Sequence, residues 1–136
     1  MRLSDSARVR DLSEQLGYPL AHKQIVARIE KILSLPEHVA LVAEEDRVVG
    51  WIHCYVSYLI EVPITWVEIG GLVVDESMRG RGVGHELVAA AEAWTRENGY
   101  ADIMVRSASH RAGAHEFYLK LGFNLEKTQM RFAKAL

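Results

Sequence analysis

One stretch in the middle of the chain limits the folds that it can adopt. Residues 65–74 are mostly β-branched or apolar, which predicts a buried strand. After a glycine-rich turn, apolar residues recur at helical spacing from Val83 to Trp94, with a stop signal at Asn98-Gly99. Residues 103–106 predict another strand. A strand, a helix and a strand in this order form a crossover, which makes the two strands parallel and is almost always right-handed.

The segments before the crossover predict two helices and a hairpin. Helical stripes run from Val9 to Leu16 and from Ile25 to Leu33, with Ser4 or Asp5 as a candidate N-cap. Residues 39–43 and 48–58 are rich in β-branched and aromatic side chains and flank a polar turn. These strands are expected to be antiparallel.

The segments after the crossover predict one more helix and the end of the sheet. Residues 114–121 carry a helical apolar face that Gly122 stops, and residues 123–132 can supply one or two last strands. The glycine pair Gly70-Gly71 inside the third strand suggests a bulge or a close backbone approach. The whole order predicts an α/β fold with a mixed sheet and helices on its faces.

Composition narrows the class of protein. With 136 residues, 49% of them hydrophobic, the chain is expected to form a single domain over 1–136. A net charge of -2 disfavours nucleic acid or an anionic membrane as partner. The only cysteine, Cys54, rules out an internal disulfide and a multi-cysteine metal site, and we expect no metal. No apolar run reaches 18 residues and Met1 to Asp5 hold no signal core, so a soluble, cytoplasmic protein is expected.

The turn between strand and helix, residues 72–84, suits an anion. The first N–H groups of a helix lack internal partners, and the helix dipole places partial positive charge there. Glycines let a bulky ligand approach the backbone, and Arg79 and Arg81 add charge that pairs with phosphate. The segment therefore predicts a phosphate or pyrophosphate cradle, although a solvated Gly/Arg turn would have the same composition.

Two common phosphate loops do not fit this segment. A P-loop needs Lys-Ser/Thr after its glycines, and a dinucleotide fingerprint starting at Gly80 or Gly82 would need a glycine where His85 or Leu87 stands. The pattern that remains, Arg79-x-x-Gly82-x-Gly84, resembles the acyl-CoA pyrophosphate loop of the GNAT superfamily of N-acetyltransferases.

A second segment extends this resemblance. Residues 114–123 read Ala-His-Glu-Phe-Tyr-Leu-Lys-Leu-Gly-Phe and are similar to the family hallmark Ala-x-x-Phe-Tyr-x-Lys-x-Gly-Phe. The resemblance implies a mostly antiparallel sheet with a central parallel pair and helices on both faces. Two departures stand out. Almost no residues precede the first helix, where the family has a strand, and Arg111 replaces an asparagine that many relatives carry.

The resemblance implies acetyl-CoA as cosubstrate and assigns site residues. The pantetheine arm would pair with the backbone of the third strand, and the pyrophosphate would lie in the loop. The cofactor-binding residues implied in this way are Leu72, Val73, Val74, Arg79, Gly80, Arg81, Gly82, Val83 and Gly84.

Two residues are candidates for catalysis. Tyr118 matches the family's usual proton donor, and a neutral phenol can donate to a departing thiolate. Glu68 stands where several family members place a carboxylate that works as a base through a water. The alternatives are a core tyrosine and an ordinary solvated strand residue.

Other polar and aromatic residues carry weaker signals. We expect Asp75 and Glu76 to be loop or cap residues, and His53 and Cys54 to face opposite sides of a strand, with Cys54 buried. His110 and His115 are expected to be incidental. Four aromatic residues could line an acceptor pocket, although a core role is the stronger interpretation: Trp51, Tyr55, Tyr58 and Trp66.

The sequence therefore predicts an N-acetyltransferase that moves the acetyl group of acetyl-CoA to a primary amine by direct transfer in a ternary complex. A small-molecule amine and a protein amine both remain open. The alternatives are a non-catalytic acyl-CoA-binding sensor or scaffold and a nucleotide-binding interaction domain. A homodimer is also predicted, because the short N-terminus leaves a sheet edge that another chain could cover.

Overall fold

The computed structural model describes residues 1–136 and divides into two compact units, Met1–Val105 and Arg106–Leu136. The elements of the first unit are η1 (Leu3–Asp5), α1 (Ser6–Gln15), α2 (His22–Leu33), β1 (His38–Glu44), β2 (Val48–Ser57), β3 (Trp66–Val74), η2 (Glu76–Met78), α3 (Val83–Glu97) and β4 (Ile103–Val105). The second unit contains α4 (Ala112–Lys120). Each predicted helix and each strand up to β4 is present, with ends within a few residues of those expected.

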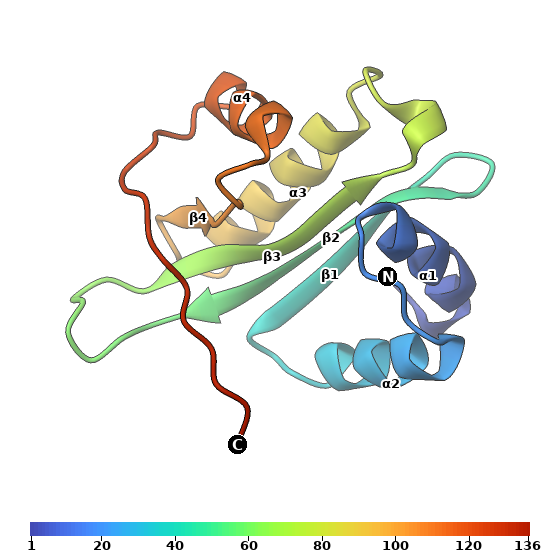
Figure 1. The fold of residues 1–136 in the computed structure, drawn as a ribbon, viewed down its shortest axis with the longest axis horizontal. Coiled ribbons are helices and arrows are strands. Elements are labelled where there is room, and N and C mark those ends of the chain that lie inside the picture. Colours follow the sequence, from blue (N-terminus) through green and yellow to red (C-terminus); the bar gives the residue numbers. More distant parts are fainter. The chain divides into compact units, whose positions relative to one another are not determined.

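The strands form one mixed sheet in the order β1-β2-β3-β4 (Figure 1). The pairs β1/β2 and β2/β3 are antiparallel, and β3/β4 is parallel across the α3 crossover. The mixed, mostly antiparallel sheet is therefore confirmed. The expectation of one or two more strands within residues 123–132 is wrong, because no strand forms there. The parallel pair therefore lies at one edge of the sheet and not at its centre.

Helices cover both faces of the sheet, as expected. Trp51 of β2 packs against Val9 of α1 and against Ile25 and Ile29 of α2. A Cβ on its neighbour Gly50 would instead lie 3.1 Å from Leu87 of α3. Because adjacent strand residues face opposite sides, α1 and α2 lie on one face and α3 on the other (Figure 1).

The glycine pair in β3 forms the predicted bulge. His53 pairs with Gly71 and the next residue, Cys54, pairs with Ile69, so Gly70 has no partner across the β2/β3 ladder. A side chain at either glycine would crowd a neighbour on β2. A Cβ on Gly71 would lie 2.8 Å from the Trp51 ring, and one on Gly70 would lie 3.1 Å from His53. The bulge reverses the alternation of β3 at this point.

The beginning of the chain contains no strand, which agrees with the departure noted in the sequence. Residues 3–5 form the short helix η1, and Asp5 precedes α1 but makes no side-chain cap, since its carboxylate accepts from the backbone N–H of Arg2. No helix is long and apolar enough to cross a membrane.

The second unit is built around α4. The helix ends at Lys120, and Gly122 takes a left-handed conformation with φ of 91°, as its role as a stop requires. Tyr118 packs edge-on between the rings of Phe117 and Phe123, at centroid distances of 5.1 and 5.4 Å. Residues 123–136 follow without regular structure.

Candidate active site

The second half of β3 presents an unpaired backbone edge. The parallel pairing with β4 ends at Ile69 and Val105, and no other strand continues on that side. The backbone N–H of Asp75 donates to Val49 of β2. Strand alternation therefore turns the N–H of Val73 toward β2 and those of Leu72 and Val74 toward the open edge. Two N–H groups of the predicted pantetheine site are thus available to an extended ligand, and the third is committed to the sheet.

The glycine loop continues directly from this edge into α3. Gly80 and Gly82 have φ of 76° and 84°, a left-handed region that other residues rarely adopt, and no atom lies within 4 Å of a Cβ on either. Gly82 is the N-cap of α3 and its carbonyl accepts from Glu86. The backbone N–H groups of Val83, Gly84 and His85 precede the first bond within the helix, so they can bind an anion.

The side chains of the loop separate into inward and outward groups. Val83 is 6% exposed and packs under Gly50, so only its backbone can meet a ligand. Arg79 and Arg81 are exposed, and the Nε of Arg79 donates to the carbonyl of Val74 at 3.4 Å. The loop that leads into α3 therefore carries two exposed positive charges, as a phosphate site requires.

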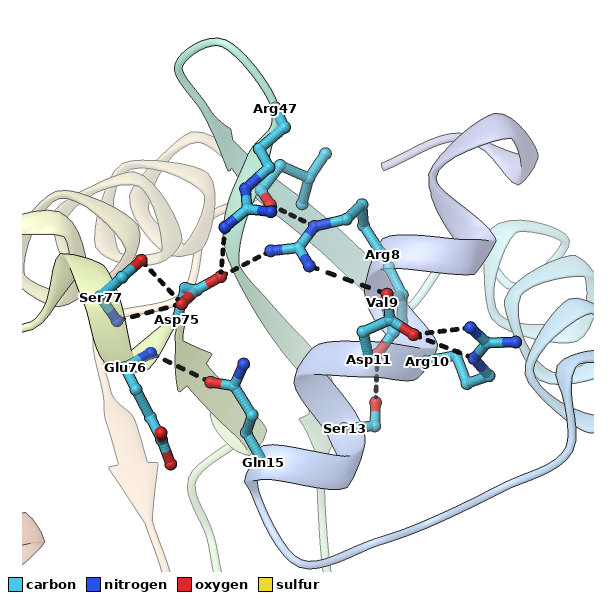
Figure 2. Close-up of polar contacts among 11 residues, drawn as sticks. Arg8, Val9, Arg10, Asp11, Ser13, Gln15, Arg47, Asp75, Glu76 and Ser77 are labelled. Carbon is cyan, nitrogen blue, oxygen red and sulfur yellow. Dashed lines mark hydrogen bonds and ion pairs between the residues drawn. The ribbon is translucent and has the colours of Figure 1, made fainter.

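Asp75 anchors the start of the loop (Figure 2). The carboxylate is buried and caps η2 by accepting from the backbone N–H and the hydroxyl of Ser77. Its other oxygen lies 2.6 Å from Arg8 and 3.3 Å from Arg47. These bonds, the first with the Ser77 backbone, lower the pKa of Asp75 from 3.8 to about 2. The expectation that Asp75 is a cap residue is confirmed.

Glu68 is a buried carboxylate on the face of the sheet that carries α1 and α2. It is 4% exposed, so the alternative of a solvated strand residue is wrong. Its Oε2 accepts from the indole N–H of Trp66 at 3.3 Å. Glu68 lies opposite Tyr55 of β2 and two residues before the bulge at Gly70.

On the same face as Glu68, His53 pairs with His38, a contact that the sequence did not predict. The Nδ1 of His38 and the Nε2 of His53 lie 3.0 Å apart in a hydrogen bond. The ring of His38 stacks on that of Tyr55, and the ring of His53 lies tilted against it. Burial, followed by the neighbouring His38, lowers the pKa of His53 to about 4. The signal that could have found the pair is the hairpin register, which sets Ala40 opposite His53 and thereby His38 diagonal to it.

The remaining candidates fall in different places. Tyr118 lies on α4 in the second unit, half-buried among aromatic rings. Cys54 is fully buried on the face opposite His53, as expected, and burial raises its pKa to about 12. Trp51 and Trp66 serve the core, but Tyr58 is 63% exposed.

The geometry of the first unit fits the acyl-CoA that the resemblance implies. Gly80 and Gly82 leave room beside the N-terminus of α3, where a pyrophosphate would find N–H groups and two arginines. The edge from Val74 back to Leu72 provides N–H groups for an extended arm. A ligand that is anionic at one end and peptide-like along its length would match both parts.

Comparisons with known proteins agree with this geometry. Residues 7–123 match the acetyltransferase (GNAT) family. The aminoalkylphosphonate N-acetyltransferase of Salmonella typhimurium is 34% identical over 100 residues, which are 73% of this chain and 63% of that protein. The chain therefore spans less than two thirds of that relative.

Solved structures share the fold. AAC(6')-Iy, in complex with the bisubstrate analog CoA-S-monomethyl-acetylneamine, has a TM-score of 0.88 at 21% identity, covering 100% of this chain and 95% of that one. Aminoglycoside antibiotic 6'-N-acetyltransferase AAC(6')-IG from Acinetobacter haemolyticus has a TM-score of 0.82 at 18% identity, covering 98% and 92%. With both hallmark segments inside the matched residues and the fold shared over the full length, the chain belongs to the GNAT acetyltransferase family.

Proposed function

We propose that this protein transfers the acetyl group of acetyl-CoA to a primary amine, directly, with both substrates bound together. The observation that carries the proposal is the continuous backbone surface from Leu72 through the glycine loop to the first turn of α3. Its unpaired N–H groups, two left-handed glycines and exposed arginines have the chemistry that an acyl-CoA requires.

Each part of this surface has a separate task. Leu72 and Val74 would donate backbone hydrogen bonds to the pantetheine arm, and Gly80, Gly82 and Gly84 would admit the pyrophosphate to the N–H groups of α3. Arg79 and Arg81 would pair with its charge. Acetyl-CoA supplies the activated acetyl group, and the chain's task is to hold it in an orientation that an amine can attack.

Proton transfer needs a base and an acid. An alkylamine is mostly protonated at neutral pH, so one proton must leave before it attacks. Glu68 is our candidate for that base, because it is a buried carboxylate beside the bulge where the open edge of β3 begins. Tyr118 is our candidate for the acid that protonates the departing thiolate.

The acceptor is the least constrained part of the proposal. The curated relative is named for aminoalkylphosphonates and the structural neighbours for aminoglycosides, which favours a small polar amine. A protein amine is the alternative. The panel that tests the proposal should therefore contain an aminoalkylphosphonate, an aminoglycoside, a simple diamine and a lysine-containing peptide.

The experiment is a screen of this panel by mass spectrometry with acetyl-CoA as donor. A product heavier by one acetyl group, formed only with protein and acetyl-CoA, is the expected result. Calorimetric titration with acetyl-CoA separates the alternatives. Tight binding without turnover on any amine would favour the non-catalytic acyl-CoA-binding module, and no binding at all would refute the cosubstrate assignment.

A further inference from the structure

Four ionisable side chains form a row across three strands on one face of the sheet. His38 lies on β1, His53 and Tyr55 on β2, and Glu68 on β3. The rings of His38 and His53 are stacked, with centroids 5.2 Å apart and an interplanar angle of 11°. The helices α1 and α2 cover this face with apolar side chains packed on Trp51, farther along β2.

The hydrogen bond between the two histidines leaves one ring nitrogen at each end of the pair. The Nε2 of His53 bonds to the Nδ1 of His38, so the Nδ1 of His53 and the Nε2 of His38 are the outer nitrogens. Each neutral imidazole carries a single N–H, so one ring must donate and the other accept. The pair therefore has two tautomeric arrangements, and a proton that enters at one end can displace a proton at the other.

The His53 end of the pair, at Nδ1, lies at the glycine bulge. The Nδ1 of His53 is 3.1 Å from the position that a Cβ would occupy on Gly70, which is itself exposed. Gly70 is also where the open edge of β3 begins, about 13 Å along the strand from Val74 and the glycine loop. An extended ligand anchored at the loop would end beside this nitrogen.

The His38 end of the pair, at Nε2, lies at the margin of the sheet. His38 is half-buried on β1, an edge strand of the sheet order. The amino group of Met1 lies along the same margin, where it donates to the carbonyl of Ala40. Two other ionisable groups lie on this face: Tyr55, whose ring stacks on His38, and Glu68, which lies opposite Tyr55.

We propose that His53 and His38 form a proton relay that carries a proton from the acceptor nitrogen at the glycine bulge to solvent. The inference rests on the proposed function. An ammonium acceptor loses two protons during acetylation, and Glu68 accounts for only one of them. The second becomes acidic when the nitrogen bonds to the acetyl carbon, and His53 is placed to receive it.

In the relay step each proton that enters the pair is matched by one that leaves it. The nitrogen–carbon bond forms, the carbon–sulfur bond breaks with its electron pair going to sulfur, and the sulfur takes a proton from Tyr118. The N–H proton of the acceptor passes to Nδ1 of His53, the Nε2 proton of His53 passes to Nδ1 of His38, and Nε2 of His38 releases its proton to solvent. Tyr118 recovers a proton from solvent, and both imidazoles end neutral in the opposite tautomer. Exchange with solvent restores the first tautomer and removes the proton from Glu68 before the next turnover.

Burial suits His53 to this role. Because burial disfavours the imidazolium, His53 is neutral at physiological pH and does not repel an ammonium substrate. A buried imidazole that had to hold the proton by itself would be a weak base. In the relay, the Nε2 proton of His53 leaves toward His38 as the substrate proton arrives at Nδ1, so no buried imidazolium needs to accumulate.

The first test does not depend on activity. Nitrogen-15 NMR of the histidine rings in the ligand-free protein should show His53 as neutral at pH 7, with an N–H in the hydrogen bond that it shares with His38. In the His38→Ala variant the His53 signals should shift. A His53 ring that is an imidazolium at pH 7, or one whose nitrogen-15 signals do not shift in His38→Ala, would overturn the relay.

The second test separates proton transport from hydrogen bonding. His38→Asn places an amide near the position of Nδ1 and can keep the bond to His53, but it cannot pass a proton onward. We expect kcat to fall roughly 10²-fold in His38→Asn and in His53→Gln, with KM for acetyl-CoA nearly unchanged. Added imidazole should restore part of the rate of the His38 variants.

The matched control is His22→Gln. His22 is an exposed histidine on α2 that bonds to the hydroxyl of Ser6, away from this row, and its loss should leave kcat unchanged. Wild-type kcat in both relay variants, measured where a solvent isotope effect shows that proton transfer limits the rate, would overturn the relay alone. A wild-type protein that acetylates no amine would overturn the proposed function and the relay with it.

Discussion

Replacing Asp75 by Asn should destabilise the protein because one carboxylate serves two sets of donors. One oxygen accepts from the N–H and hydroxyl of Ser77, and the other accepts from Arg8 and Arg47. An asparagine has a single acceptor oxygen. Whichever way its amide turns, an NH₂ group faces either Ser77 or the two guanidinium groups, so one set of bonds is lost.

The size of the loss can be worked from the structure. The pKa of Asp75 falls from 3.8 to about 2, chiefly through the Ser77 backbone bond and then Arg8. A difference of this size corresponds to about 2 kcal/mol. Because the Arg47 side chain is 58% exposed, solvent screening reduces that to about 1–2 kcal/mol. The mismatched donor adds about 1 kcal/mol, so the variant should lose about 2–3 kcal/mol of unfolding free energy.

The charge-dependent part of this loss should depend on pH with a definite sign. The folded-state pKa lies below the ordinary value, so the stabilisation is fully present above about pH 4. It disappears as the pH falls toward 2, where the folded protein takes up the proton. The gap between wild type and Asp75→Asn should therefore narrow between pH 4 and pH 2.

Urea unfolding followed by circular dichroism at pH 7, 5 and 3 measures this gap. Glu76→Gln is the matched control, because Glu76 is the next residue, is exposed and should change stability by less than about 0.5 kcal/mol. If Asp75→Asn unfolds at the wild-type urea concentration, or if its deficit is the same at every pH, the buried ion pair does not contribute as reasoned.

Three further predictions concern ligand binding, catalysis and assembly. Gly82→Ala should weaken acetyl-CoA binding in calorimetry by roughly tenfold, because alanine is strained at a φ of 84°, whereas Gly99→Ala, equally strained at 83° but at the other end of α3, should leave affinity unchanged. Equal affinities in the two variants would contradict the loop assignment. Tyr118→Phe should lower kcat by roughly 10²- to 10⁴-fold with little change in acetyl-CoA affinity, and wild-type turnover under rate-limiting chemistry would remove the hydroxyl from the mechanism. Light scattering should give twice the chain mass of 15.3 kDa, and a monomer at micromolar concentration would refute the homodimer.

Local patterns determined most of the elements and the position of the glycine loop. The helical stripes at Val9 and Ile25, the hairpin and the crossover are all present, because each is encoded by periodicity within a short window. The glycine pair within a strand pattern predicted the bulge in β3, and the structure shows that Trp51 and His53 of β2 lie close to it. The turn at Gly82 is local too, because its left-handed φ is a property of one residue.

Tertiary structure decided which distant residues meet. Arg8 and Asp75 are 67 positions apart, and their ion pair depends on how α1 packs beside the end of β3. The pairing of His38 with His53 depends on the register of a hairpin, where a slip by one residue would turn one of them to the other face. The burial of Glu68 likewise follows from packing, because a single carboxylate in a strand carries no sign of what will cover it. Periodicity specifies the face that a residue occupies, whereas contacts between faces arise only when the strands and helices assemble.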